Sequence, residues 1–317
     1  MPITVTALIP SYGRPDSLVR CLDGLLAGER LPDEIIVIAR NTDPETRAAA
    51  EGWASGKAVA GFKLVTVTAP GQIAAMNAGL LHATGDVVTF PDDDCIPRPD
   101  WLRRVMSHYD DPQVGGVGGR DVVHVDGQEN APTVTRVGEI TWYGRIIGKH
   151  HFAVSGGPRP VMHLKGVNMS FRRRLLVPFD PLIRGPHIND TDISLAVYRQ
   201  GYQLIFDPEA RVDHYPATRP DTPGGRNLAD PRLVFLDAHD WTYLLLKHQP
   251  AWLRPINLLY ALLVGTRRRP GLLLGLPRPR LWPVMAAALR GSVTAVGTAL
   301  RCPKDRGLSS PPPSEAG

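Results

Sequence analysis

The sequence predicts an α/β fold with a mostly parallel central sheet and helices on both faces. In the first hundred residues, short β-rich runs alternate with helical segments, as βα units do. The composition is 43% hydrophobic and 21% charged, which supports a sizeable core. The 317 residues are enough for one large α/β domain with an appendage, or for two domains.

The elements of the first half follow one another in a regular order. The first strand is expected over 3–9 (ITVTALI), where Pro10 stops it, and a helix with apolar residues at helical spacing then runs from Asp16 to Gly28. Further strands are expected over 33–40, 62–69 and 85–90, and further helices over 43–54, 71–84 and 100–109. In such sheets ligands gather at the carboxyl ends of the strands, so the loops at 10–15, 39–43 and 91–97 are of most interest.

The second half is less regular. Strands are expected over 114–125 and 203–208, a helix over 189–202 that Gly201 closes, and loops with short strands over 127–160. We therefore predict a catalytic domain over 1–232, a helical, basic and apolar region over 233–303, and a disordered tail over 304–317.

The net charge of +5 is concentrated near the C-terminus. Between residues 266 and 306, eight Arg and one Lys interleave with Leu, Trp and Val against a single acid, Asp305. This pattern favours an anionic membrane surface, with no nucleic acid as partner. The longest apolar stretch, 255–266, is too short to span a bilayer, so we expect a peripheral position on the cytoplasmic face of the membrane. Three scattered Cys and no signal peptide suit the cytoplasm.

Three consecutive carboxylates, Asp92, Asp93 and Asp94, follow the strand expected over 85–90. Like charges this close oppose one another's ionisation unless a cation or solvent relieves them. Because side chains alternate at a strand end, Asp92 and Asp94 can point the same way, and carboxylate ligation suits Mg²⁺ or Mn²⁺ carrying substrate phosphates. The alternative is a solvated acidic turn.

Two further acids, Asp190 and Asp192, open the helix at 189–202. Either they simply complement the helix dipole, worth about 0.3–1 kcal/mol, or one is a general base that the dipole keeps ionised. His214 follows the strand expected over 203–208 and is of interest as a third metal ligand, although a lone His is more often a structural residue.

Five blocks in order resemble family 2 glycosyltransferases, which have the GT-A fold, invert the anomeric carbon and include bacterial polysaccharide enzymes. The blocks are ALIPSYGRPDSLVRCLDGLL, PDEIIVIARNTDPET, GQIAAMNAGLLHATGDVVTFPDDD, LKGVNMSFRR and NDTDISLAVYRQGYQLIFDPEARVDHYP, and they span about Ile3 to Pro216. The resemblance implies transfer of a sugar from a nucleotide-diphosphate donor to the hydroxyl of a glycan or lipid-linked acceptor.

The resemblance also implies a role for each matching residue. Asp92 and Asp94 match the metal motif, with His214 as a further ligand of metal or diphosphate, and Asp190 rather than Asp192 matches the base. Contacts to the donor nucleotide are implied for Pro10, Ser11, Tyr12, Arg40, Asp43, Asn77, Gly79, Asp92 and Asp93, and contacts on the acceptor side for Gly166 and Asn168.

Three positions depart from the family's pattern: Ala39 stands where an Asp is usual, Met76 replaces an Arg, and Asn189 replaces a Glu. Two other hypotheses therefore remain. One is a scaffold that has kept the fold and lost catalysis. The other is a sugar-nucleotide pyrophosphorylase, although PSYGRPD is not the Gly-rich loop that such an enzyme carries after its first strand.

Overall fold

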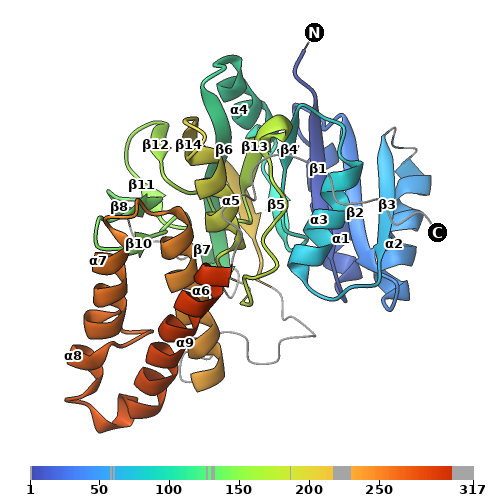
Figure 1. The fold of residues 1–317 in the computed structure, drawn as a ribbon. Helices are drawn as coiled ribbons and strands as arrows, with labels where there is room; N and C mark the ends of the chain where they lie inside the picture. The colour runs from blue at the N-terminus through green and yellow to red at the C-terminus, as the bar shows by residue number, and fades with distance from the viewer. Residues whose placement is uncertain are drawn as a thin grey trace. The chain divides into compact units, whose positions relative to one another are not determined.

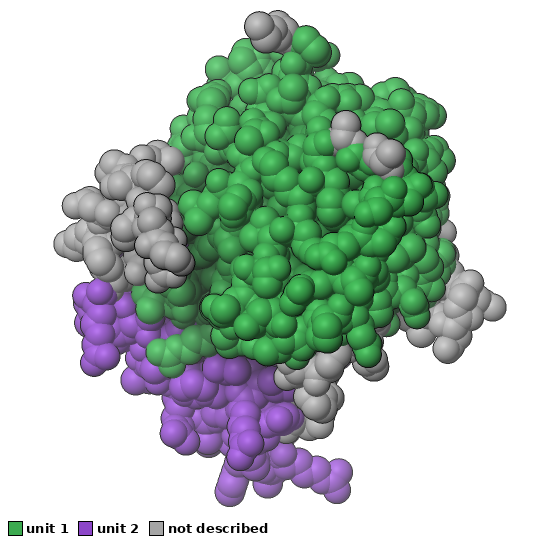
Figure 2. Space-filling view, turned by 90° about the vertical axis from the view of Figure 1, so that its right-hand side faces the viewer, with its two compact units in different colours: residues 1–227 green, residues 228–317 purple. Residues whose placement is uncertain are grey.

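The structure is a computed structural model that describes residues 2–57, 59, 61–125, 128–129, 133–185, 187–216 and 230–301. It divides into two compact units, residues 1–227 and 228–317, which Figure 2 colours separately. The predicted tail at 304–317 lies outside the described residues. The predicted domain boundaries remain predictions.

A ten-stranded sheet forms the centre of the first unit (Figure 1). Its main path runs β12-β14-β6-β13-β4-β1-β2-β3, with β5 paired to β14 and β7 to β6. The strands are β1 (Val5–Ser11), β2 (Glu34–Arg40), β3 (Phe62–Val67), β4 (Val87–Thr89), β5 (Cys95–Pro97), β6 (Val114–Val125), β7 (Gln128–Glu129), β12 (Arg159–Val161), β13 (Met169–Arg172) and β14 (Gln203–His214).

Most neighbouring strands of this path are parallel. The pairs β1–β2, β2–β3, β1–β4 and β6–β14 are parallel, whereas β13 runs antiparallel to both of its neighbours. Two small two-stranded sheets lie off the main one: β9 (Glu139–Ile140) with β10 (Ile146–Ile147), and β8 (Thr133–Val134) with β11 (Ala153–Val154).

Helices cover both faces of the sheet, and the alternation along β1 shows why. Val5, Ala7 and Ile9 belong to the core that includes α1, α2 and α4, whereas Leu8 belongs to the core that includes α3 and α5. A strand whose two faces are both buried needs apolar residues throughout, which is why β1 reads as a continuous apolar run. These helices are α1 (Pro15–Leu26), α2 (Pro44–Lys57), α3 (Gln72–His82), α4 (Trp101–Ser107) and α5 (Asn189–Tyr198).

The second unit consists of helices. They are α6 (Pro231–His248), α7 (Arg254–Leu259), α8 (Leu272–Gly275) and α9 (Trp282–Arg301), with a π-helical turn, η3, at Tyr260–Val264. Polar side chains join α6 to α9: His239 lies 2.9 Å from the Thr298 hydroxyl, and the Thr242 hydroxyl donates to Ser292 at 3.0 Å.

One helical stretch in the described part of the chain has the length and composition to cross a membrane. It covers Pro279–Arg301, with a mean hydropathy of 1.2. The apolar run noted in the sequence at 255–266 lies instead in α7 and η3.

The predicted α/β class is confirmed, and so is the order of the expected strands and helices up to α4. One detail was wrong: the expected break after residue 208 is absent, and β14 continues to His214 as one strand with a bulge. His214 therefore lies at the end of a strand in the main sheet, opposite Cys95 of β5.

Candidate active site

The loops expected to carry the chemistry meet at one edge of the sheet. In the parallel register of β1 and β2, Pro10 lies opposite Ile38 and Ser11 opposite Ala39, so the loops after both strands leave side by side. Because β4 is also parallel to β1, the Asp triplet emerges at the same edge. Three segments that are distant in sequence thus meet where parallel sheets bind their ligands.

The Asp triplet alternates in exposure. Asp93 is only 1% exposed, whereas its two neighbours are partly exposed. Burial raises the pKa of Asp93 to about 7, even though the Arg14 guanidinium and the Ser11 hydroxyl favour its charged form. The Arg14 guanidinium lies 2.8 Å from both Asp93 and Asp94, and the Ser11 hydroxyl donates to Asp93 at 2.7 Å. A cation of the chain itself therefore relieves the repulsion within the triplet.

A second basic group contacts the triplet from β14. His214 Nε2 lies 3.3 Å from Asp94, and His214 Nδ1 lies 2.9 Å from Asp121 of β6. Burial disfavours charge on His214, but the two carboxylates outweigh it and raise its pKa to about 9. Asp121 also forms an ion pair with Lys165, and its pKa is well below the usual range despite its burial.

The loops after β1 and β2 form a second part of the site. Asp43 caps α2 by accepting a hydrogen bond from the Thr46 amide at 3.1 Å, and it also accepts one from the Gly13 amide at 2.5 Å. These hydrogen bonds outweigh burial and lower the pKa of Asp43. Arg40 stacks over the Tyr12 ring, with its guanidinium carbon 5.3 Å from the ring centre. Pro10, Ser11, Tyr12, Arg40 and Asp43 therefore lie close together.

The acids that begin α5 occupy different environments. Asp190 is partly exposed, and it accepts hydrogen bonds from the amides of Gly166 at 3.0 Å and Thr191 at 2.6 Å. Asp192 is buried, at 3% exposure. The structure thus brings Gly166 and Asp190 together, and it leaves Asp190 as the more accessible acid.

Asn77 and Asn168 were predicted to contact the substrates, but their side-chain amides form hydrogen bonds within the protein. The Asn77 side chain donates to the Phe179 carbonyl at 2.9 Å and accepts from the Phe179 amide at 2.7 Å. Asn168 is buried, accepts from the Trp101 indole at 2.8 Å and donates to the Ala210 carbonyl at 2.8 Å. Each amide therefore joins segments that are distant in sequence.

Gly79, a third position predicted to contact the donor, is buried in α3. A Cβ at this position would lie 2.8 Å from both Leu8 and Ile38. The absence of a side chain therefore serves the close packing of α3 on β1 and β2.

The residues around the triplet suit a divalent cation that arrives with its substrate. No cluster of three or more potential ligands is preassembled among the described residues. Mg²⁺ and Mn²⁺ are commonly held by one or two carboxylates together with substrate phosphates and water. Asp92 and Asp94, the two partly exposed acids, offer such a pair, with His214 at 3.3 Å from Asp94.

Arg14, Asp121 and Lys165 are site residues that the sequence did not point to. Arg14 precedes α1 and Lys165 lies before β13; both stand in blocks that resemble the family, but the resemblance implied no role for either. Asp121 sits in a glycine-rich strand about 30 residues from the triplet, and only the pairing of β6 with β14 brings it to His214. A prediction that β6 and β14 pair in parallel would have been the one signal that placed Asp121 beside His214.

Residues 6–176, more than half of the chain, match the family described as Glycosyl transferase family 2. The chain belongs to this family. This family agrees with the resemblance seen in the sequence.

Curated proteins match short parts of the chain. The O-antigen biosynthesis protein RfbC of Myxococcus xanthus is 33% identical over 117 residues, 36% of this chain and 9% of that protein. Glycosyltransferase AglE of Haloferax volcanii is 26% identical over 118 residues, 36% of this chain and 38% of that protein. Pre-mycofactocin glycosyltransferase of Mycobacterium tuberculosis is 43% identical over 58 residues, 18% of this chain and 12% of that protein. The chain thus spans well under half the length of these relatives.

Solved structures share the GT-A fold. The mannosyltransferase PcManGT from Pyrobaculum calidifontis, in complex with GDP-Man and Mn²⁺, gives a TM-score of 0.51 at 19% identity over 95% of this chain and 76% of that one. GalNAc-T7 with UDP, GalNAc and Mn²⁺ gives a TM-score of 0.54 at 16% identity over 80% of this chain and 53% of that one. S. aureus TarS 1–349 gives a TM-score of 0.57 at 12% identity over 94% of this chain and 83% of that one. The central α/β sheet is therefore that of nucleotide-diphospho-sugar transferases.

Proposed function

We propose that the protein is an inverting, metal-assisted glycosyltransferase that uses a nucleotide-diphosphate sugar as donor. The observation that carries this proposal is the charge arrangement at the sheet edge: Asp93 and Asp94, two acids of the triplet that follows β4, contact Arg14, and Asp94 also contacts His214. Such an arrangement can bind a cation and an anion together, as a metal-bound diphosphate requires. Two of the structural relatives contain a nucleotide with Mn²⁺, which supports the same ligand class.

In this proposal the residues of the triplet take separate roles. Asp92 and Asp94 hold Mg²⁺ or Mn²⁺, which supplies positive charge to the departing diphosphate. Arg14 and His214 are cations that contact Asp94 and add stabilisation of the same sign. Tyr12, Arg40 and Asp43 contact the base and ribose, with Asp43 acting in place of the family's usual acid at position 39.

Asp190 is the proposed general base. Asp190 lies in the first turn of α5, and hydrogen bonds from the amides of Gly166 and Thr191 hold its side chain in place. The partly exposed carboxylate accepts the proton of the acceptor hydroxyl as that oxygen attacks the anomeric carbon. Gly166, whose amide bonds Asp190, then lies on the acceptor side.

We further propose that the second unit docks on the cytoplasmic face of an anionic membrane, where a glycan or lipid-linked acceptor is presented. Six large apolar side chains between residues 259 and 282 are 36–64% exposed: Leu259, Leu263, Val264, Leu273, Leu276 and Trp282. The exposed Arg267, Arg278 and Arg280 interleave with them. No acid occurs between Asp240 and Asp305. We call these nine residues the apolar–basic tip.

The composition of the tip suits a lipid surface better than water. Apolar side chains enter the boundary between headgroups and acyl chains, while each arginine near an anionic surface contributes about 1 kcal/mol. In α9, by contrast, Gly291 lies against the Phe235 backbone of α6, where a Cβ would be 2.4 Å from the Phe235 carbonyl oxygen. One face of α9 is therefore packed against α6, which favours docking on the membrane over crossing it.

A thermal-shift panel tests the proposed donor site. UDP, GDP, dTDP and CDP are each added with and without Mn²⁺, and the right nucleotide raises the unfolding midpoint because it binds only the folded state. Asp92→Ala is expected to remove the manganese-dependent part of the shift. No shift with any of the four nucleotides would refute the proposal and leave the inactive scaffold as the better hypothesis.

A further inference from the structure

Two carboxylates hold the imidazole ring of His214, one at each ring nitrogen. Its Nδ1 atom lies 2.9 Å from Asp121, and its Nε2 atom lies 3.3 Å from Asp94 of the triplet. His214 is 5% exposed and Asp121 is fully buried, so little solvent reaches either contact. The two ring nitrogens are distinct, and the partner of one decides what the other presents. The contact with Asp121 therefore leaves Nε2 as the nitrogen that faces the triplet.

The backbone of β14 brings His214 to the triplet without help from its side chain. In the antiparallel pairing with β5, His214 lies opposite Cys95, and the Tyr215 amide donates to the Asp94 carbonyl at 2.9 Å. On its other side β14 pairs in parallel with β6, the strand that carries Asp121. Because backbone hydrogen bonds already join these strands, the side chain of Asp121 is not needed to pair them. What it adds is a direction for the imidazole ring.

Asp121 is itself held firmly. One of its carboxylate oxygens contacts His214, and the other forms the ion pair with Lys165. Its backbone amide donates to the His150 carbonyl at 3.2 Å. Histidines at metal sites are commonly held in this way, by a carboxylate on the ring nitrogen that faces away from the ligand.

We propose that Asp121 is a positioning residue of the donor site. It accepts a hydrogen bond from Nδ1–H of His214 and so directs Nε2 at the place where Asp94 and the metal-bound diphosphate meet. The inference rests on the proposed function and deepens it, because it adds a residue that acts through His214 and touches neither metal nor substrate. The competing explanation is that Asp121 only compensates the charge of Lys165.

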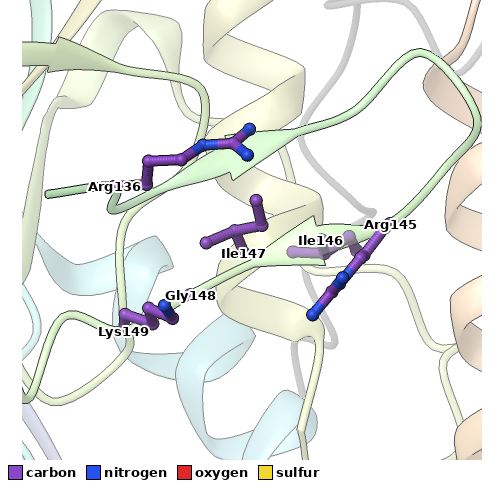
Figure 3. A pocket seen from close by; sticks show the side chains of 6 residues that line it. All are labelled: Arg136, Arg145, Ile146, Ile147, Gly148 and Lys149. Carbon is purple, nitrogen blue, oxygen red and sulfur yellow. The ribbon is translucent and has the colours of Figure 1, made fainter. Parts of the chain in front are cut away.

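A second basic feature of the first unit must be separated from this site. Figure 3 shows a pocket of about 240 Å³ beside the β9–β10 hairpin, lined by Arg136 and by residues 145–149. Three of its lining side chains are cationic and none is acidic, so it is another place where a small anion finds compensating charge. Arg145→Gln with Lys149→Gln removes two of these cations and controls for binding there.

Isothermal titration of the full chain with Mg²⁺ pyrophosphate, a diphosphate without base or sugar, tests the inference. Asp121→Asn is expected to weaken binding by about 10- to 100-fold, as the loss of such a carboxylate does at metal sites. The amide keeps the shape of the side chain but has one acceptor oxygen for two partners. Removal of a negative charge would by itself strengthen the binding of an anion, so a loss of affinity reports the orientation of His214.

The matched control is Asp207→Asn. Asp207 is a buried acid of β14 at 3% exposure, and it contacts the ring of His108 at 3.0 Å. This variant removes the same kind of carboxylate–histidine contact away from the triplet. It is expected to bind Mg²⁺ pyrophosphate as the wild type does, and so is the Arg145 and Lys149 double variant.

A double-mutant cycle shows whether Asp121 acts through His214. Asp121→Asn combined with His214→Gln is expected to bind no more weakly than His214→Gln alone, because the ring to be positioned is gone. If Asp121→Asn weakens binding equally in both backgrounds, its role is structural and the inference is overturned. Unchanged or tighter binding by Asp121→Asn overturns it as well. If Asp121→Asn does not fold, Asp121→Glu replaces it, since the extra methylene group displaces the carboxylate and keeps the charge.

Thermal shifts with UDP, GDP, dTDP and CDP in Mn²⁺, measured on the same proteins, separate this inference from the proposed function. A wild type that binds Mg²⁺ pyrophosphate through Asp121 and His214 but none of the nucleotides would refute the proposed donor and support the positioning role. A wild type that binds a nucleotide with Mn²⁺, and keeps this binding in Asp121→Asn, would refute only the positioning role. A wild type that binds neither would refute both.

Discussion

The Arg14 guanidinium lies 2.8 Å from a carboxylate oxygen of Asp94, in the loop where the proposed metal ligands emerge from the sheet. The same guanidinium reaches the buried Asp93, also at 2.8 Å. Arg14 therefore holds the acidic triplet together without a metal. A divalent cation that binds Asp94 shares this carboxylate with Arg14 or displaces it.

We predict that Arg14→Ala destabilises the metal-free protein. Removing one partner of a largely buried ion pair costs about 3 kcal/mol, because the remaining charges are left uncompensated. Urea unfolding in EDTA measures this loss, and added Mn²⁺ is expected to raise the midpoint more in the variant than in the wild type. Arg20→Ala, an exposed change on α1, is the control. Equal responses to Mn²⁺ in the wild type and the Arg14 variant would show that Arg14 does not compete for the metal site.

Asp190→Asn is expected to lower kcat by a factor of about 10² to 10⁴, the usual contribution of a general base. Binding of the nucleotide with Mn²⁺ should be unchanged, since the variant keeps the shape of the side chain and the donor site lies elsewhere. Asp192→Asn is the matched comparison, two residues away in α5 and buried. Steady-state kinetics with both variants decides between them: a loss in Asp192→Asn as large as that in Asp190→Asn would contradict the assignment of the base.

Asn168→Leu is expected to lower the free energy of unfolding by about 2 kcal/mol. The change leaves the buried Trp101 indole N–H without its acceptor, and a buried polar group that loses its partner costs about 1–3 kcal/mol. In a Trp101→Phe background the same substitution should cost about 1 kcal/mol less, because the orphaned donor is gone. Denaturant unfolding of the four proteins in this cycle measures the coupling. Zero coupling would show that the hydrogen bond between Trp101 and Asn168 does not stabilise the folded protein.

Stability at acid pH is expected to depend on Glu34, which is buried at the start of β2. Burial disfavours its charge, but hydrogen bonds from Lys63, Thr6 and Thr84 outweigh it and lower its pKa below the usual 4.5. The stabilisation is therefore fully present above about pH 4.5 and is lost as the pH falls through the lower value in the folded protein.

Glu34→Gln should flatten the decline in the free energy of unfolding on the acid side, measured by urea unfolding at a series of pH values from 3 to 7. Glu51→Gln, an exposed change in α2, should leave the decline as it is. A Glu34 variant with the wild-type pH dependence would mean that this carboxylate titrates alike in both states.

The apolar–basic tip is expected to bind anionic vesicles. Reversing Arg267, Arg278 and Arg280 to Glu should weaken co-sedimentation with vesicles of phosphatidylglycerol by more than 10-fold, at about 1 kcal/mol per charge near the surface. Neutral phosphatidylcholine vesicles should bind both proteins weakly. If the triple variant sediments with anionic vesicles as the wild type does, the tip is not the membrane-binding surface.

Much of the fold could be predicted because its signals are local. The apolar runs of β1 and β2, the helical spacing of Leu18, Cys21 and Leu22, and the acids after β4 all appear within short windows of sequence. Parallel strands then place their carboxyl ends together, so the meeting of Ser11, Asp43 and Asp93 followed from the order of elements.

The remainder depends on contacts between distant segments. Asp121 and His214 are 93 residues apart, and Arg14 and Asp94 are 80 apart, so no local pattern marks either pair. Asn77 and Asn168 match family blocks in the sequence, yet their amides bond the protein itself. The β9–β10 hairpin lies in the segment expected as loops with short strands, but its bounds could not be predicted because strands of two residues carry no periodicity.

The central claim is that Asp92 and Asp94 hold a divalent cation with the donor diphosphate, and an anomalous difference map tests it most directly. The crystal would contain Mn²⁺ and whichever nucleoside diphosphate raises the unfolding midpoint. The account predicts a manganese peak about 2.0–2.3 Å from oxygens of Asp92 or Asp94, with the diphosphate as a further ligand. A manganese–diphosphate peak bound elsewhere on the protein would contradict it.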